Sequence, residues 1–177
     1  HHSLASHPKP EEAVDEADKH GVTALEYTCW RGHVEAADYL LRMGADPTKR
    51  DMFGLQALHK AVGHGNTEVA TRLLADGGVD PNARCGDVHA PAEYLARTKH
   101  QTALHIACAH EQYGKGAVAE PRMVQLLLRF GSRPSLQDDL GDTPLHCAAL
   151  RGDVSTVRML LRAGADYKMA NFDGKYP

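Results

Sequence analysis

Apolar residues recur at helical spacing in several short segments of the chain. Near the C-terminus, Val154, Val157, Leu160 and Leu161 are spaced so that they fall on one face of a helix. The segment before them is rich in Ala and Cys, whose small side chains let neighbouring helices approach closely. Gly152 separates the two segments, and glycine readily adopts the left-handed conformation that ends a helix. The pattern therefore predicts two short helices joined by a tight turn.

This pattern occurs four times. A four-residue motif opens each copy, and the copies are Thr23-Ala24-Leu25-Glu26, Gln56-Ala57-Leu58-His59, Thr102-Ala103-Leu104-His105 and Thr143-Pro144-Leu145-His146. The first two copies start 33 residues apart, and the later gaps of 46 and 41 residues are the same period with insertions of 13 and 8. A fixed period of this length indicates a repeat protein, in which each unit buries its apolar face against its neighbours.

The repeated residues resemble the ankyrin repeat. Residues 138–152 match the family pattern D-x-x-G-x-T-P-L-H-x-A-A-x-x-G, and the second helix ends on L-L-x-x-G-A-D at 160–166. The resemblance implies an all-α solenoid of stacked helix-turn-helix units connected by β-hairpin loops. It covers residues 18–177, with repeats at about 18–50, 51–84, 85–137 (which contains both insertions), 138–170 and the start of a fifth at 171–177.

Outside the repeats, residues 1–17 are assigned to an N-terminal tail, whose leading histidines are typical of a purification tag. Because the fifth unit stops before its first helix, the parent protein is expected to continue beyond residue 177. The insertions, at about 85–98 and 111–121, are long loops that are either functional or merely tolerated. The first extends a hairpin, so it is a candidate for gating the binding surface.

Glu26, Thr28, Gln56 and His100 depart from the family pattern. Glu26 and Thr28 make the first unit more polar, as expected of a terminal repeat that meets solvent on its outer face. His100 stands where the hairpin glycine is expected, which predicts a distorted third hairpin. Cys85 lies in an insertion, where an exposed thiol is expected.

Composition and charge narrow the function classes. Twenty Lys and Arg against 23 Asp and Glu give a net charge of -3, so no overall basic field attracts nucleic acid or anionic lipid. No apolar run is long enough to cross a membrane. The cysteines form no C-x-x-C pair and no dense framework, which favours a reducing compartment, the cytoplasm or the nucleus.

No set of residues in the sequence predicts catalysis, a cofactor or a metal site. His59, His105 and His146 recur with the repeat, and neighbouring units would hold them about 10 Å apart, too far to share a metal ion. The resemblance implies that these histidines are structural and form hydrogen bonds within the motif and to neighbouring loops. A metal-dependent activity is the weaker alternative.

A concave surface is the expected binding site. Stacked units present their hairpin tips and the ends of their first helices along one extended face. In the family, the variable positions of this face flank the hairpin glycine and precede the glycine between the helices. The candidate partner-binding residues at these positions are Trp30, Arg31, Met52, Phe53, Leu55, His64, Leu140, Leu150, Arg151 and Phe172. Trp and Arg are enriched at interface hot spots, and the chain has only one Trp and three Phe.

The sequence therefore predicts a non-catalytic module, an adaptor or scaffold, that binds a protein or peptide in this groove. Trp30, Met52, Phe53, Leu55 and Leu150 are the expected apolar anchors. The two candidate arginines of the groove are expected to select acidic or carbonyl groups. No nucleic acid and no membrane insertion are expected, and the segment alone is expected to be a monomer. The alternative is a targeting or regulatory region of a larger enzyme or channel whose active part lies beyond residue 177.

Overall fold

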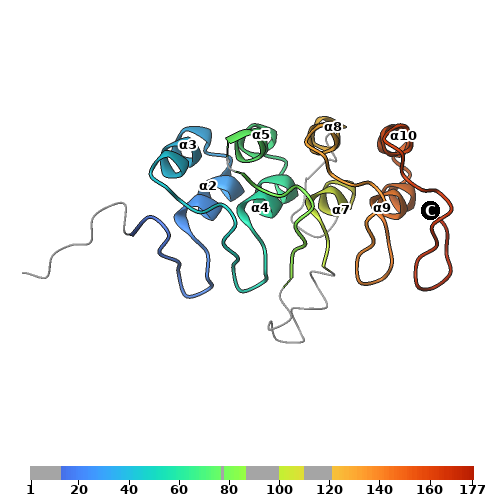
Figure 1. Ribbon diagram of the computed structural model, residues 1–177, viewed down its shortest axis with the longest axis horizontal. Coiled ribbons are helices and arrows are strands. Elements are labelled where there is room, and N and C mark those ends of the chain that lie inside the picture. Colours follow the sequence, from blue (N-terminus) through green and yellow to red (C-terminus); the bar gives the residue numbers. More distant parts are fainter. Residues whose placement is uncertain (1–12, 77, 87–99, 110–120) are drawn as a thin grey trace, which may run out of the picture.

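Pairs of short helices, each pair one repeat unit, stack side by side along the chain. The computed structural model describes residues 13–76, 78–86, 100–109 and 121–177. In chain order the described helices are α2 (Ala24–Arg31), α3 (Val34–Arg42), α4 (Ala57–Gly63), α5 (Thr67–Asp76), α7 (Ala103–Cys108), α8 (Pro121–Arg129), α9 (Pro144–Arg151) and α10 (Val154–Arg162). The first helices of the units, α2, α4, α7 and α9, form one row, and the second helices, α3, α5, α8 and α10, form another (Figure 1). The all-α repeat solenoid predicted from the sequence is confirmed.

Local hydrogen bonds set the ends of the first helices. Thr23, Thr102 and Thr143 are extended N-cap residues whose hydroxyl oxygens accept a hydrogen bond from the backbone N–H three residues later. This bond satisfies a donor that the first turn of a helix otherwise leaves open. At the other end, Gly32 and Gly152 are left-handed C-caps with φ of 76° and 67°, as the sequence predicts.

The core is a thin double layer of aliphatic side chains. The leucine of the opening motif is buried in every unit, and so is the first leucine of the Leu-Leu pair in the last three units: Leu25, Leu58, Leu104 and Leu145, then Leu73, Leu127 and Leu160. Alanines and cysteines fill the spaces between the rows of helices. Short paired helices leave little room for large rings, which explains why the chain holds so few of them.

The hairpin loops of the first, second, fourth and fifth units project to one side of the helix rows (Figure 1). In the first, second, fourth and fifth units, an Asp or Asn side chain accepts two backbone N–H groups across the loop. Asp138, for example, accepts from Leu140 at 2.9 Å and from Asp142 at 3.0 Å. Asp18, Asp51 and Asn171 make the same pair of bonds. The Asp or Asn at the start of these four units is therefore a structural residue of the hairpin.

The third unit pairs the two ends of its hairpin without this aspartate, and residues 87–99 between them lie outside the described residues. The Cys85 backbone N–H donates to the Gln101 carbonyl at 2.8 Å, and His100 adopts the left-handed conformation of the missing glycine, with φ of 45°. A β-carbon makes this conformation cost about 1–2 kcal/mol. The expected exposure of Cys85 is wrong, because this thiol is fully buried against the core. Most of both insertions, including the proposed gating segment, lies outside the described residues.

The expected role of Glu26 is also wrong. Only 1% of this residue is exposed, so its charge does not lie on the outer face of the terminal unit. The Thr23 backbone N–H donates to its Oε2 at 2.9 Å, and Oε1 has no hydrogen-bond partner among the described residues. Glu26 therefore replaces the histidine of the other units in the same buried place.

Candidate functional site

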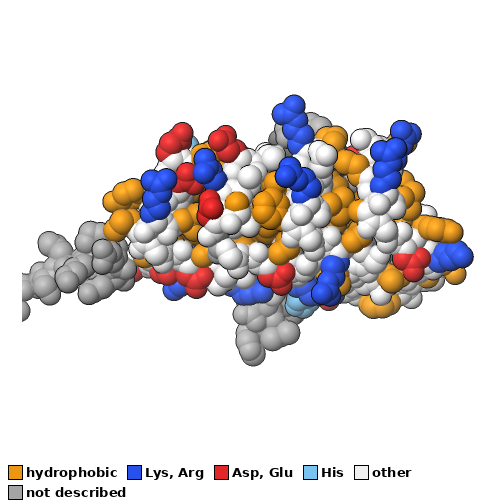
Figure 2. All heavy atoms as spheres, turned by 45° about the horizontal axis from the view of Figure 1, so that its top comes forward, with side chains coloured by type: hydrophobic (Ala, Val, Ile, Leu, Met, Phe, Trp, Pro, Cys, Tyr) orange, Lys and Arg blue, Asp and Glu red, His pale blue; other side chains and the backbone are white. Residues whose placement is uncertain are grey.

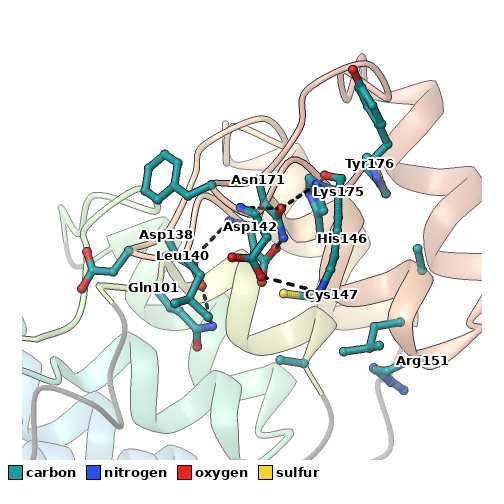
Figure 3. Close-up of a pocket in the computed structure, with 17 residues that line it drawn as sticks. Gln101, Asp138, Leu140, Asp142, His146, Cys147, Arg151, Asn171, Lys175 and Tyr176 are labelled. Atoms are coloured by element: carbon teal, nitrogen blue, oxygen red, sulfur yellow. Dashed lines mark hydrogen bonds and ion pairs between the residues drawn. The ribbon is translucent and has the colours of Figure 1, made fainter.

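A hollow of about 1100 Å³ opens between the third, fourth and fifth units (Figure 3). Leu140 and Phe172 reach it from two hairpins, and Leu150 and Arg151 reach it from the C-terminal end of α9. The structure thus brings together four residues that the sequence predicts as separate positions of one surface. Leu150 is 91% exposed and Phe172 is 72% exposed, so both apolar side chains are available to a partner.

Polar groups surround these apolar side chains. The Arg151 guanidinium donates to the Cys108 carbonyl oxygen at 3.1 Å, which ties its position to the end of α7. The Asn171 amide donates to the Asp142 carboxylate at 2.8 Å. The Gln101 amide nitrogen donates to Asp138, and its buried oxygen has no partner among the described residues. Apolar anchors beside a few fixed polar groups are the usual composition of a recognition site.

A second cluster lies at the ends of the first helices in units one and two. The Trp30 ring packs edge-on against His64, with ring centroids 5.7 Å apart, and lies 6.0 Å from the Tyr27 ring. The Arg31 guanidinium lies 4.9 Å from the centroid of the Trp30 ring, within range of a cation–π interaction. Burial lowers the pKa of His64, so this ring is mainly neutral at pH 7. The cluster (Tyr27, Trp30, Arg31 and His64) presents neutral aromatic surface and one cation.

Sequence reasoning did not identify Tyr27. It lies three residues before Trp30, which places the two rings on one face of α2. This three-residue spacing from Trp30 in the sequence indicates that Tyr27 is exposed on the same face. The tyrosine hydroxyl donates to Asp18 at 2.9 Å and so holds the ring against the first hairpin.

The remaining candidates lie in the second hairpin and are less accessible than expected. Leu55 is only 8% exposed and belongs to the core, so its expected role as a partner anchor is wrong. Phe53 is half-buried and packs against the core. Met52 is half-buried, its backbone N–H donates to the His20 carbonyl oxygen at 2.9 Å, and its sulfur lies 3.2 Å from the His20 ring. The second hairpin mainly packs against its neighbours.

The recurrent histidines form hydrogen bonds within their motif and to neighbouring loops, as the resemblance implies. In His59, His105 and His146, Nδ1 accepts the backbone N–H of the N-cap residue at 3.1–3.2 Å. Nε2 of His59 lies 3.0 Å from the Ala83 carbonyl oxygen at the end of its own unit. Nε2 of His105 and of His146 lies 3.0–3.1 Å from the carbonyl oxygen of Asp142 or Lys175 in the following unit, so Nε2 is the donor nitrogen of each ring. Burial lowers the pKa of His105 and lowers that of His59 to about 4. Both nitrogens of each ring are occupied and unavailable as metal ligands.

The described residues hold no group of three or more His, Cys, Asp or Glu side chains arranged for a metal ion. The thiols of Cys29 and Cys108 are unreactive as well. Burial raises the pKa of Cys29 to about 12 and raises that of Cys108, which keeps both protonated and poor nucleophiles. Among the described helices, none combines the length and apolarity that crossing a bilayer requires.

The fold defines an all-α helical-repeat protein. A family model of ankyrin repeats in many copies matches residues 22–74 and 119–161, together more than half of the chain. The chain belongs to the ankyrin repeat family. Ankyrin repeats are non-catalytic modules that bind proteins.

Known relatives carry similar segments within longer proteins. Over 72% of its own length, the chain is 35% identical to mouse ankyrin repeat and SOCS box protein 16. It is 29% identical to the palmitoyltransferase AKR1 of Lachancea kluyveri over 86%, and 28% identical to the human transient receptor potential cation channel subfamily A member 1 over 88%. The aligned regions make up only 25%, 18% and 12% of these relatives, so the similarity concerns their repeats alone.

Proposed function

We propose that this chain is a protein-binding adaptor or scaffold module, and that a peptide segment of its partner occupies the hollow at units three to five. The observation that carries the proposal is the convergence of Leu140, Leu150, Arg151 and Phe172 on one hollow. Exposed leucine and phenylalanine supply apolar contact area, and the hydrogen-bonded Arg151 is held ready for a carbonyl or carboxylate group.

The rigidity of the surface favours binding. Hairpin bonds and helix caps hold the lining residues in place before a partner arrives, which reduces the ordering cost of association. The cysteines form no disulfide among the described residues, which is compatible with a reducing compartment, the cytoplasm or nucleus.

Selection from a displayed peptide library tests the proposal, because such a library samples many candidate ligands at once. We expect enriched peptides to carry apolar side chains beside an acidic group, and to bind Leu150→Ala or Phe172→Ala at least about tenfold more weakly, which is the loss typical of a hot-spot residue. Leu161→Ala is the matched control, because Leu161 is also an exposed leucine but lies on α10 outside the hollow. Equal affinities for the Leu150 and Leu161 variants would contradict the proposal.

The second candidate function is regulation or targeting of a larger enzyme or channel. It is favoured by the similarity to segments of a palmitoyltransferase and of a cation channel. The sequence of the full parent protein separates the candidates. A catalytic motif or transmembrane run supports this second function, and further repeats alone support an adaptor.

A further inference from the structure

The charge on the outer row of helices changes sign along the solenoid. Three equivalent positions on each second helix face away from the first-helix row. They hold Glu35, Asp38 and Arg42 in α3, then Glu68, Thr71 and Ala75 in α5, then Arg122, Gln125 and Arg129 in α8, and finally Ser155, Arg158 and Arg162 in α10. At these positions the first two units therefore carry a net negative charge. In α8 and α10, the charged residues at these positions are all arginines. Figure 2 shows red side chains among the blue over α3 and α5, and blue ones over α8 and α10.

The four arginines of α8 and α10 form one patch, which we call the arginine ridge. All four are exposed, and the two helices pack against each other. Parallel helices pack about 10 Å apart, and Arg122 and Arg129 are separated by about 10 Å along α8, at 1.5 Å per residue. These spacings are close to the Debye length of about 8 Å at physiological salt, so the four charges act together on a ligand.

No carboxylate within the described residues pairs with the arginine ridge. Asp166 follows α10, and its Oδ1 accepts the Lys168 backbone N–H at 2.8 Å. Asp153 precedes α10 and is also engaged. Its oxygens accept hydrogen bonds from the backbone of Ser155 and Thr156 and from the Thr156 hydroxyl. Glu120 precedes α8 in the sequence and lies outside the described residues. By contrast, Arg72 in the acidic half lies 3.8 Å from Asp38. The charges of the ridge are open to an external anion.

Apolar side chains accompany these charges. Val154, Arg158 and Leu161 are spaced four and three residues apart, which places them on one face of α10, and all three are exposed. Cationic side chains beside exposed aliphatic ones suit a membrane interface, where the cations meet anionic headgroups and the aliphatic groups enter the boundary with the acyl chains. A broad planar ligand can contact all four arginines at once.

From this arrangement we propose that the arginine ridge docks the protein on the surface of an anionic lipid bilayer. The proposal concerns the outer helices and is independent of the hollow that carries the proposed protein-binding function. It also explains how a chain with a net charge of -3 binds an anionic surface, because the acidic residues of the outer row are confined to the first two units.

Vesicle sedimentation tests the proposal on the full chain. We expect binding to vesicles of equal parts phosphatidylserine and phosphatidylcholine, and none to phosphatidylcholine alone. A surface arginine contributes about fivefold in affinity. The double variant Arg129→Gln/Arg162→Gln should therefore bind about 25-fold more weakly, and removal of all four arginines should abolish binding.

The matched control is Arg42→Gln/Arg72→Gln, which removes two exposed arginines from the outer row of the acidic half. It should change vesicle affinity less than about twofold, because the neighbouring acids already offset those charges. Circular dichroism verifies that every variant is folded. Equal losses in the two double variants, equal binding to neutral vesicles, or binding to polyglutamate with none to anionic vesicles would overturn the proposal. Leu150→Ala, which tests the hollow, should leave vesicle binding unchanged.

Discussion

At the scale of single residues, Glu26 is the most unusual group in the described structure. The other units place a histidine here, with both ring nitrogens in hydrogen bonds. Glu26 offers one oxygen to the Thr23 N–H and leaves the other without a partner among the described residues. Burial is the main reason that its pKa rises from 4.5 to about 7, opposed by the hydrogen bond from Thr23. A charged Glu26 is therefore unfavourable in the folded state.

This shift predicts that Glu26 makes stability fall with rising pH. Its contribution is complete below pH 4.5, where the unfolded chain also holds the proton, and is lost as the pH rises to about 7. From pH 5 to pH 8, we expect the free energy of unfolding of the wild type to fall by about 1–3 kcal/mol more than that of Glu26→Gln, after allowance for solvent screening. Urea unfolding at both pH values measures the difference.

The comparison with Glu26→Gln is needed because His59 has the opposite effect. Its lowered pKa gives a contribution that is present above pH 6.5 and lost as the pH falls to about 4. The difference between wild type and variant cancels this effect. Glu68→Gln, an exposed control on α5, should keep the wild-type pH dependence. The same pH dependence in Glu26→Gln and wild type would contradict the assignment.

A second residue-scale prediction concerns two glycines at equivalent helix ends. Both are left-handed, so alanine strains either one. At Gly32, a β-carbon would also lie 2.6 Å from the Asn66 side-chain oxygen, whereas at Gly152 nothing lies within 4 Å. The Asn66 amide donates to the carbonyl oxygens of Cys29 and Trp30. We expect Gly32→Ala to lower the free energy of unfolding by about 1–2 kcal/mol more than Gly152→Ala, because only Gly32→Ala disturbs the bonds of Asn66.

Urea denaturation of both glycine variants measures this difference. The strain inherent in a left-handed alanine cancels between them, which isolates the contact with the asparagine. Adding Asn66→Ala to each variant should bring the two costs together. If the costs are already equal with Asn66 present, its side chain does not hold the end of α2.

At the scale of elements, hairpins position the residues of the proposed binding surface. The Phe172 backbone N–H donates to the Leu140 carbonyl oxygen at 3.0 Å, and the first two hairpins make the equivalent bond between Met52 and His20. Side chains at the hairpin tips thus keep their spacing through main-chain bonds. The position of Phe172 in the hollow depends on the fourth hairpin.

This dependence predicts different effects at two hairpin glycines. A β-carbon on Gly141 would lie 2.7 Å from the Phe172 backbone nitrogen, whereas one on Gly174 has nothing within 4 Å. Both residues have φ of 75–76°, so the backbone strain is matched. Gly141→Ala should break the bond from Phe172 to Leu140 and speed hydrogen exchange of the Phe172 amide at least tenfold relative to Gly174→Ala, since a net hydrogen bond of about 1–1.5 kcal/mol corresponds to roughly that factor. Similar exchange rates of the Phe172 amide in the two variants would refute this dependence of Phe172 on the fourth hairpin.

At the scale of the whole molecule, two candidate subsites lie on the face formed by the ends of the first helices. The Trp30 cluster belongs to units one and two, and the hollow belongs to units three to five. Three steps between stacked helices of about 10 Å each separate units one and four by about 30 Å. An extended peptide of about nine residues covers that distance.

This geometry predicts a length dependence that Trp30 fluorescence reports. The chain has one tryptophan, and it is partly exposed. Selected peptides longer than about nine residues should shift its emission to shorter wavelength on binding, because they cover the ring, and shorter ones should not. Unchanged emission for long peptides that still require Leu150 would confine the site to the hollow.

The sequence by itself determined the repeat architecture. Thr143 caps a helix and Gly152 ends one through bonds and backbone angles within a few residues, so their roles are visible in the local pattern. The period of the leucines then dictates stacking, because no single unit can bury its own apolar face. The part of the hollow formed by Leu140, Leu150, Arg151 and Phe172 could be predicted for the same reason, since each lies at a repeated position.

Only the tertiary structure decided which of these positions are accessible. Burial of a side chain depends on neighbours that lie a whole repeat or more away. Leu55 and Cys85 are buried by such neighbours, and so is Glu26, whereas Leu150 remains exposed. The arginine ridge has the same origin, because Arg129 and Arg162 are 33 residues apart in the sequence and share one surface only when the units stack.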